Sequence, residues 1–174
     1  MEREASTERN ARFGALMDAA LDEARRARDA DEVPIGAVVA ITGAVVGRGF
    51  NQPISSGDPT AHAEIVAIRD AARTVGNYRL TGAVLCVTIE PCLMCVGALV
   101  HARVATLVFG ALEPRTGAVT STVRGVELPG HNHRVEVIAG VREAECRELM
   151  QAFFLARRRS GAALLERRSL GEGD

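Results

Sequence analysis

Two short stretches decide how the rest of this chain is interpreted: His62-Ala63-Glu64 and Pro91-Cys92-Leu93-Met94-Cys95. Imidazole and thiolate are ligands that zinc prefers, and catalytic zinc sites have three protein ligands and keep one position for water. Glu64 stands two positions after the histidine, where a carboxylate can take a proton from that water. The pattern predicts one zinc ion per chain, with Glu64 as the catalytic residue and with His62, Cys92 and Cys95 as the metal ligands.

A zinc ion that only stabilises the fold is the alternative, and it requires a fourth ligand. The candidates are the remaining cysteines and histidines: Cys86, Cys146, His101, His131 and His133. Cys86 lies within an apolar run and is typical of a core residue. The chain has no second C-x-x-C pair, and a carboxylate beside the histidine favours a catalytic site.

The composition is that of an ordinary globular protein. The chain has 174 residues, a net charge of −1, 47% hydrophobic and 25% charged residues, which predicts a single domain over 1–174 with a core of about 8–159 and a flexible tail at 160–174. No apolar run reaches about 18 residues, so no membrane span is expected. The polar N-terminus predicts no secretory signal and a cytoplasmic location, where C-x-x-C favours metal over a disulfide.

Apolar periodicity predicts the helices and strands. Helices are expected at 8–30, 61–75, 91–102 and 142–159, and strands at 35–41, 44–50, 83–89, 104–109 and 135–139. Asp58 or Thr60 is expected to cap the second helix, and Pro91 to open the third. The segment 110–132 is expected to be irregular.

This order predicts an α/β protein with a mixed five-stranded sheet and helices on both faces. The strands 83–89 and 104–109 flank one helix, which is a right-handed parallel crossover, whereas the opening hairpin is antiparallel. The two halves of the zinc motif fall at the starts of the second and third helices. Helix N-termini favour thiolate, and open α/β sheets place their sites at such strand ends.

Six segments, beyond the zinc ligands alone, carry a recognisable pattern: 32–38 (Glu-Val-Pro-Ile-Gly-Ala-Val), 49–51 (Gly-Phe-Asn), 58–65 (Asp-Pro-Thr-Ala-His-Ala-Glu-Ile), 77–80 (Asn-Tyr-Arg-Leu), 90–95 (Glu-Pro-Cys-Leu-Met-Cys) and 132–135 (Asn-His-Arg-Val). From about Glu8 to Arg159 the chain resembles the tRNA-specific adenosine deaminases, within the cytidine and deoxycytidylate deaminase superfamily. The zinc signature marks the superfamily. The segments 77–80 and 132–135, with Phe153-Phe154, point to the tRNA enzymes.

The resemblance implies a three-layer α/β/α, cytidine-deaminase-like fold and zinc-dependent hydrolysis of adenosine to inosine at the wobble position of a tRNA anticodon. It also implies a homodimer that contacts an anticodon stem-loop with both subunits. The apolar segment 93–109 could supply the dimer interface. Deamination of a free base or nucleoside, such as guanine or cytosine, is the alternative. The basic last helix and Asn132-His133-Arg134 argue against it.

The resemblance also assigns substrate contacts. Asn51 would bind the target nucleoside, and the backbone of Ala63 would bind the base edge. Glu113 stands where an aspartate is usual for a flanking ribose, and Leu112 where a polar side chain is frequent. The other implied contacts are Arg115 and Asn132 in loops, and Phe154, Arg157 and Arg158 on the last helix.

Each contact also has a structural explanation. Asn51 could hold the turn before Pro53, and Asn132 could order its loop. The arginines could compensate the helix dipole. Only one of Phe153 and Phe154 can face the core, so the other is a stacking platform or a dimer contact.

Overall fold

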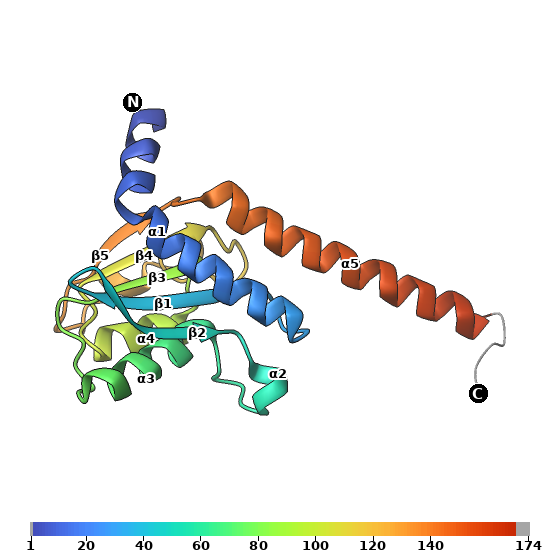
Figure 1. The fold of residues 1–174 in the computed structure, drawn as a ribbon, viewed down its shortest axis with the longest axis horizontal. Helices are drawn as coiled ribbons and strands as arrows, with labels where there is room; N and C mark the ends of the chain where they lie inside the picture. The colour runs from blue at the N-terminus through green and yellow to red at the C-terminus, as the bar shows by residue number, and fades with distance from the viewer. Residues whose placement is uncertain (1, 170–174) are drawn as a thin grey trace.

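A five-stranded mixed sheet lies between two layers of helices in the computed structural model, which describes residues 2–169 and the side chains of residues 7, 8 and 10–160 (Figure 1). The strand order is β2-β1-β3-β4-β5. The strands are β1 (Gly36–Ile41), β2 (Ala44–Phe50), β3 (Val84–Ile89), β4 (Thr106–Ala111) and β5 (Glu136–Ala139). The helices are α1 (Glu2–Asp29), α2 (Pro53–Ser56), α3 (Ala63–Val75), α4 (Leu93–His101) and α5 (Glu143–Ser169), with a 3-10 turn η1 (Gly125–Glu127).

Strand directions confirm the predicted mixed sheet. β1 is antiparallel to both β2 and β3, whereas β3, β4 and β5 are parallel. The helix α4 connects β3 to β4, as a parallel crossover requires. The carboxyl end of β3 therefore leads directly into the segment that carries Cys92 and Cys95.

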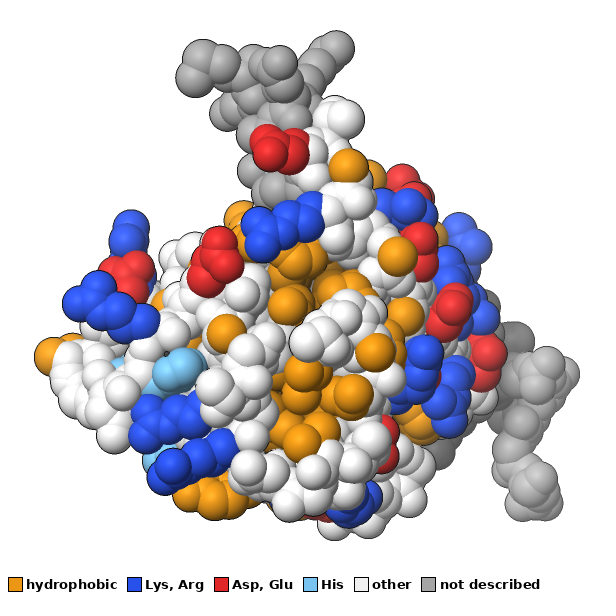
Figure 2. Space-filling view, turned by 60° about the vertical axis from the view of Figure 1, so that its left-hand side comes forward, with side chains coloured by type: hydrophobic (Ala, Val, Ile, Leu, Met, Phe, Trp, Pro, Cys, Tyr) orange, Lys and Arg blue, Asp and Glu red, His pale blue; other side chains and the backbone are white. Residues whose placement is uncertain are grey.

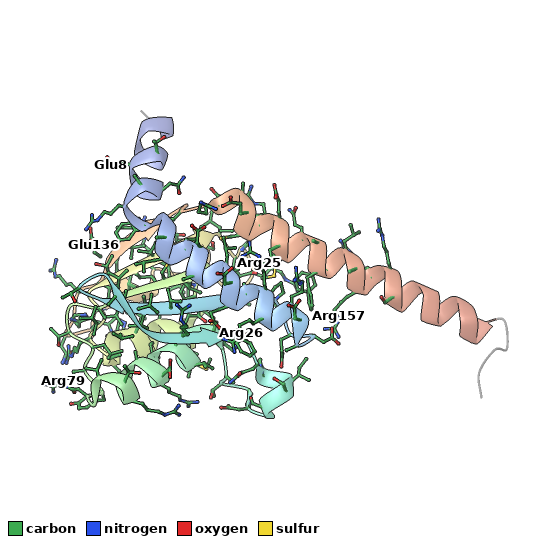
Figure 3. The ribbon with its side chains drawn as sticks, in the orientation of Figure 1. Glu8, Arg25, Arg26, Arg79, Glu136 and Arg157 are labelled. Carbon is green, nitrogen blue, oxygen red and sulfur yellow. The ribbon has the colours of Figure 1, made fainter. Side chains whose placement is uncertain are left out.

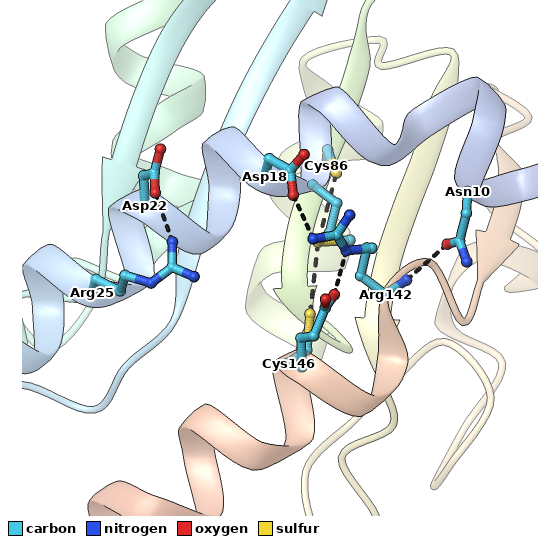
Figure 4. Close-up of polar contacts among 9 residues, drawn as sticks. Asn10, Asp18, Asp22, Arg25, Cys86, Arg142 and Cys146 are labelled. Carbon is cyan, nitrogen blue, oxygen red and sulfur yellow. Dashed lines mark hydrogen bonds and ion pairs between the residues drawn. The ribbon is translucent and has the colours of Figure 1, made fainter.

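Alternating strand residues divide the core into two halves. Leu85 and Val87 belong to the cluster beneath α3 and α4, whereas Cys86 belongs to the cluster beneath α1 and α5. α1 and α5 are joined through Arg142, whose guanidinium lies 2.9 Å from Asp18 and whose backbone N–H donates to Asn10 (Figure 4). The two faces of the sheet are therefore closed by separate helix pairs.

Gly49 allows α3 to approach β2 closely. A Cβ atom at this position would stand 2.4 Å from both the carbonyl oxygen of Ala63 and the backbone nitrogen of Ala67. Only glycine fits such a contact, which places the first turn of α3 directly against the strand.

Several boundaries differ from those predicted. α3 and α4 each begin two residues later, because His62 and Cys92 are extended N-cap residues with ψ of 153° and 171°. Cys92 is held extended by a bridge to Gly117, so Pro91 precedes the cap rather than opening the helix. Neither Asp58 nor Thr60 caps α3, because His62 is its N-cap residue; the carboxylate of Asp58 accepts hydrogen bonds from the backbone and hydroxyl of Thr60.

Two differences concern whole segments. The short helix α2 lies where the sequence predicted only a loop, and α5 continues to Ser169 instead of ending near Arg159. Residues 170–174 of the predicted flexible tail lie outside the described residues. Among residues 2–169, none of the helices combines the length and apolar character that spanning a membrane requires.

Candidate active site

His62, Cys92 and Cys95 form a compact ligand group. Both sulfur atoms lie 3.6 Å from Nδ1 of His62 and 3.7 Å from each other. Zn–S and Zn–N bonds in a tetrahedral site give edges of about 3.8 Å between sulfurs and about 3.6 Å between sulfur and nitrogen. The three side chains could therefore hold a metal ion, and both the donor set and its spacing fit zinc.

A fourth protein ligand is absent from this group within the part of the chain that the structure describes. Cys86 and Cys146 lie on the opposite face of the sheet, with their sulfurs 4.0 and 3.8 Å from the sulfur of Met17 (Figure 4). The rings of His131 and His133 bond to backbone carbonyl groups instead. This arrangement removes the support for a purely structural metal site.

The local backbone explains why the ligands converge. The N–H of Gln52 donates to the carbonyl of Ala61 at 3.0 Å, which fixes the segment leading to His62 beside the end of β2. Cys92 and Cys95 are three residues apart at the start of α4, so both sulfurs lie on one side of the helix.

Glu64 lies beside the ligand group but is not part of it. The residue is 4% exposed, and burial raises the pKa of its carboxyl to about 7. The hydrogen bond between the two sulfurs lowers the pKa of Cys92 to about 4 and raises the pKa of Cys95. The group therefore combines a readily formed thiolate with a carboxyl that can exchange a proton near neutrality.

Asn51 is buried, with 7% of its surface exposed, at the end of β2. Its backbone N–H donates to Ile35, but within the described residues its side-chain amide has no hydrogen-bond partner. A buried amide without a partner is costly, and a turn-forming asparagine would use this amide locally. No side-chain hydrogen bond within the described residues therefore supports the explanation that Asn51 holds the turn.

The segment 112–122 follows β4 and lies against the cysteine-bearing segment. Ala118 donates its N–H to the carbonyl of Pro91 at 2.8 Å. Glu113 is half-buried and accepts a hydrogen bond from the N–H of Arg115, while the side chain of Arg115 is exposed. The segment that carries these two predicted contacts is thus held against the cysteine-bearing segment.

Asn132 is not brought there within one chain. Its side-chain oxygen accepts a 2.7 Å hydrogen bond from Arg103, which follows the C-terminal end of α4, whereas the cysteines lie at the N-terminal end. The nine residues of α4 separate the two by about 14 Å. Arg79 and Glu136 lie on one side of the molecule (Figure 3), and Figure 2 shows arginine and histidine side chains gathered on part of the face that it presents.

The predicted RNA contacts on α5 differ in their exposure and in their partners within the protein. Phe153 is buried and Phe154 is 46% exposed, so the second ring is the one that faces outwards. Arg157 lies beside the C-terminal end of α1 (Figure 3), where its guanidinium is 3.8 Å from Asp31 and 5.4 Å from the ring of Phe153. Arg158 is exposed and has no such partner among the described residues.

One buried carboxylate next to the site was not predicted to act there. Glu90 is 3% exposed, and although burial opposes it, hydrogen bonds from Ser121 and from the backbone of Thr120 and Ser121 lower its pKa to about 2. The only signal in the sequence is a charged residue at the end of an apolar strand, directly before Pro91.

Known proteins match both the sequence and the fold. The family model of the cytidine and deoxycytidylate deaminase zinc-binding region matches residues 11–111. A tRNA-specific adenosine deaminase from Agrobacterium fabrum is 46% identical over 82% of this chain and 94% of its own length, and one from Bacillus subtilis is 40% identical over 90% and 96%.

Solved structures agree with these matches. One, from a study of A-to-I editing by tRNA:A34 deaminases at the wobble position, has a TM-score of 0.76 at 46% identity and covers 78% of this chain and 99% of that chain. Guanine deaminase from Bacillus subtilis has a TM-score of 0.54 at 37% identity and covers 57% and 64%. The sequence, the sheet order and the His-Cys-Cys group therefore agree that this chain belongs to the tRNA-specific adenosine deaminases, within the cytidine and deoxycytidylate deaminase family.

Proposed function

We propose that this protein converts adenosine to inosine at the wobble position of a tRNA anticodon. The observation that carries the proposal is the buried Glu64 beside a three-ligand metal group. The group has no fourth protein ligand within the described residues. The tRNA-specific relatives and the wobble-deaminase structure support tRNA as the substrate.

The metal ion is zinc, one per chain, held by His62, Cys92 and Cys95. The nitrogen and sulfur donors and their separations support this assignment. When bound, zinc lowers the pKa of a water molecule towards neutrality and so provides the nucleophile.

Glu64 is the proton carrier of the reaction. It accepts a proton from the attacking water and delivers it to N1 of adenine, while the oxygen of the water forms a bond to C6. Glu64 then takes the proton of the hydroxyl group now on C6 and supplies it to the exocyclic nitrogen; the C6–N bond breaks as the C6 carbonyl forms, and ammonia leaves. A carboxyl with a pKa near 7 can both take and give this proton.

Asn51 and the backbone of Ala63 hold the nucleoside. The free amide of Asn51 offers a donor and an acceptor from the strand beside the start of α3. The base has to leave its stack to reach this pocket, because C6 is inaccessible in a stacked base.

Flanking contacts provide the selection of an RNA loop. Glu113 and Arg115 lie on the loop that is held against Pro91 and Cys92, while Phe154 and Arg158 present an exposed ring and an exposed guanidinium on α5. Arg157 is a weaker candidate because its guanidinium already contacts the carboxylate of Asp31 and the ring of Phe153. Asn132 lies at the far end of α4, so it would have to act on a distant part of the RNA or across a dimer.

A homodimer is the functional unit. One side of α4 is left open and carries small or apolar residues at helical spacing, among them Leu93, Met94, Gly97 and Ala98. Val123 and Leu128 stand on either side of η1, whose Gly125 lies against Leu93, and are 37% and 41% exposed. A second copy is the fitting partner, because a two-fold axis brings the same apolar surface together with itself. The tRNA-specific relatives support the cytoplasm as its location.

Deamination of a free purine is the second candidate, favoured by the similarity to guanine deaminase. Incubation of the zinc-loaded protein with an anticodon stem-loop, free adenosine and free guanine separates the two. Mass spectrometry is expected to find inosine only in the stem-loop, at the wobble position. Equal turnover of a free purine would overturn the tRNA assignment.

A further inference from the structure

The Glu90 carboxylate is a buried acceptor for an entire loop. It lies at the carboxyl end of β3, one residue before Pro91-Cys92. Both of its oxygens are used, and the donors are four backbone N–H groups and two hydroxyls. The backbone donors are Glu113 at 3.1 Å, Val119 at 3.0 Å, Thr120 at 2.7 Å and Ser121 at 2.9 Å; the hydroxyl donors are Thr120 at 3.4 Å and Ser121.

These donors come from both ends of one segment. Glu113 lies at the start of 113–121 and the other donors lie at its end, so one carboxylate ties the two ends together. In between, Gly117 bridges to Cys92, and a Cβ atom at Gly117 would stand 2.4 Å from Oε2 of Glu90. The loop is therefore fastened both to Glu90 and to a metal ligand.

We propose that Glu90 is a positioning residue that sets where the 113–121 loop stands relative to the His62-Cys92-Cys95 group. The loop carries Glu113 and Arg115, which lie beside the nucleotide in the pocket under the proposed function, and the inference rests on that function. Glu90 touches no substrate in this role. It converts a segment without helix or strand structure into a fixed wall for the nucleotides next to the target base.

The chemistry of the carboxylate makes the role specific. Both oxygens only accept hydrogen bonds, which suits a site that contains only donors. A glutamine has almost the same shape but turns one of these acceptors into an NH₂ group. That group would face N–H donors, so Glu90→Gln would release part of the loop without leaving a cavity.

The experiment compares Glu90→Gln with Glu23→Gln in the full-length, zinc-loaded protein. Glu23 is an equally buried carboxylate on α1, paired with Arg26 at 2.8 Å and remote from the loop. We expect Glu90→Gln to raise KM for an anticodon stem-loop, with a loss of about 10- to 100-fold in kcat/KM and a smaller loss in kcat. Zinc content is expected to stay at one per chain, and Glu23→Gln to change neither kinetic constant.

Hydrogen exchange gives a readout that is independent of activity. The amides of Val119, Thr120 and Ser121 are expected to exchange faster in Glu90→Gln than in the wild type, and trypsin to cut faster after Arg115. If Glu90 were purely structural, Glu90→Gln would lower the melting temperature, but the exchange rates of these amides, the cleavage rate after Arg115 and KM would equal those of the wild type.

Three outcomes would overturn the proposal: unchanged exchange at these amides, faster exchange with unchanged KM, or loss of zinc in the glutamine variant. If Glu90→Gln does not fold, Ser121→Ala removes one hydroxyl donor and is expected to give a smaller rise in KM with zinc retained; an unchanged KM there would equally reject it. Absence of stem-loop deamination by the wild type would instead reject the proposed function, and the exchange experiment would still test the loop contact.

Discussion

Two buried glutamates beside one metal group have opposite acidities. Burial raises the pKa of Glu64 to about 7, whereas hydrogen bonds outweigh burial at Glu90 and lower its pKa to about 2. The difference arises because Glu90 receives several N–H and O–H donors and Glu64 receives few. A group that is charged at every physiological pH can anchor a loop, and one that titrates near neutrality can carry protons.

Glu64→Gln tests the proton-carrying role. The variant is expected to keep one zinc ion, because Glu64 is not among the ligands, and to lose at least about 10²- to 10⁴-fold in kcat on an anticodon stem-loop. Single-turnover kinetics with metal analysis on the same sample checks both parts. A near-normal rate would remove Glu64 from the mechanism.

Asn51→Ala tests the free amide. A buried amide that has no partner within the protein contributes no hydrogen bond to stability, so the free energy of unfolding is expected to stay within about 1 kcal/mol of the wild type. Loss of its bond to the nucleoside is expected to reduce kcat/KM about tenfold or more. Denaturant unfolding beside steady-state kinetics separates these effects. A large loss of stability with unchanged kinetics would return Asn51 to a structural role.

Sequence spacing predicted the ligands but not Glu90, and the reason is distance along the chain. His62, Glu64, Cys92 and Cys95 fall in two contiguous motifs whose chemistry can be recognised locally. The donors to Glu90 stand 23–31 residues further on, in a segment without periodicity. No local pattern reveals such partners.

At the scale of elements, alternation and helical periodicity predicted every strand and every long helix. Two of the errors, the start of α4 and the helix α2, fall where tertiary contacts decide the backbone. α4 begins at Leu93 because Cys92 pairs with Gly117 across the molecule, and α2 forms next to Glu32, whose buried carboxylate accepts from Ser55 at 2.7 Å. A prediction from the local sequence of either segment cannot include these contacts, because the partners are distant along the chain.

The helix α5 gives two adjacent arginines different surroundings, which leads to a prediction. Arg158→Ala is expected to reduce the slope of log Kd against log salt for stem-loop binding by about 0.7, the value for one phosphate contact on a single strand. Arg157→Ala is expected to change the slope less, because Asp31 already pairs with that side chain. Binding measured at several salt concentrations checks both.

Phe154→Ala is the control for that experiment. Stacking of a base on the exposed ring contributes on the order of 1–3 kcal/mol and does not depend on counterion release, so affinity should fall while the slope stays the same. Identical slopes for Arg158→Ala and the wild type would place Arg158 outside the RNA interface.

At the scale of the whole molecule, a net charge of −1 gives one chain little long-range attraction for RNA. Arg103 after the C-terminal end of α4, Arg115 on the 113–121 loop and Arg158 on α5 are local features on separate segments. Two copies that meet through α4 would combine these features around each site. The sequence predicted an apolar interface in 93–109. In the structure β4 is buried in the sheet, so the part of this segment that a second copy could contact is the outward side of α4, together with the loop residues beside it.

Ala98→Glu tests this assembly. Ala98 lies on the open side of α4, one turn beyond Cys95, so two glutamates would be buried face to face at a two-fold contact and would oppose association. Sedimentation at micromolar concentration is expected to find a dimer for the wild type and a monomer for the variant. Val75→Glu makes the same kind of substitution at an exposed position on α3 and should leave the dimer intact. The monomeric variant should keep its zinc and bind the stem-loop more weakly, because the second RNA-binding surface is lost. A wild-type monomer with full activity would contradict the dimer, and an Ala98→Glu variant that still dimerises would move the interface away from α4.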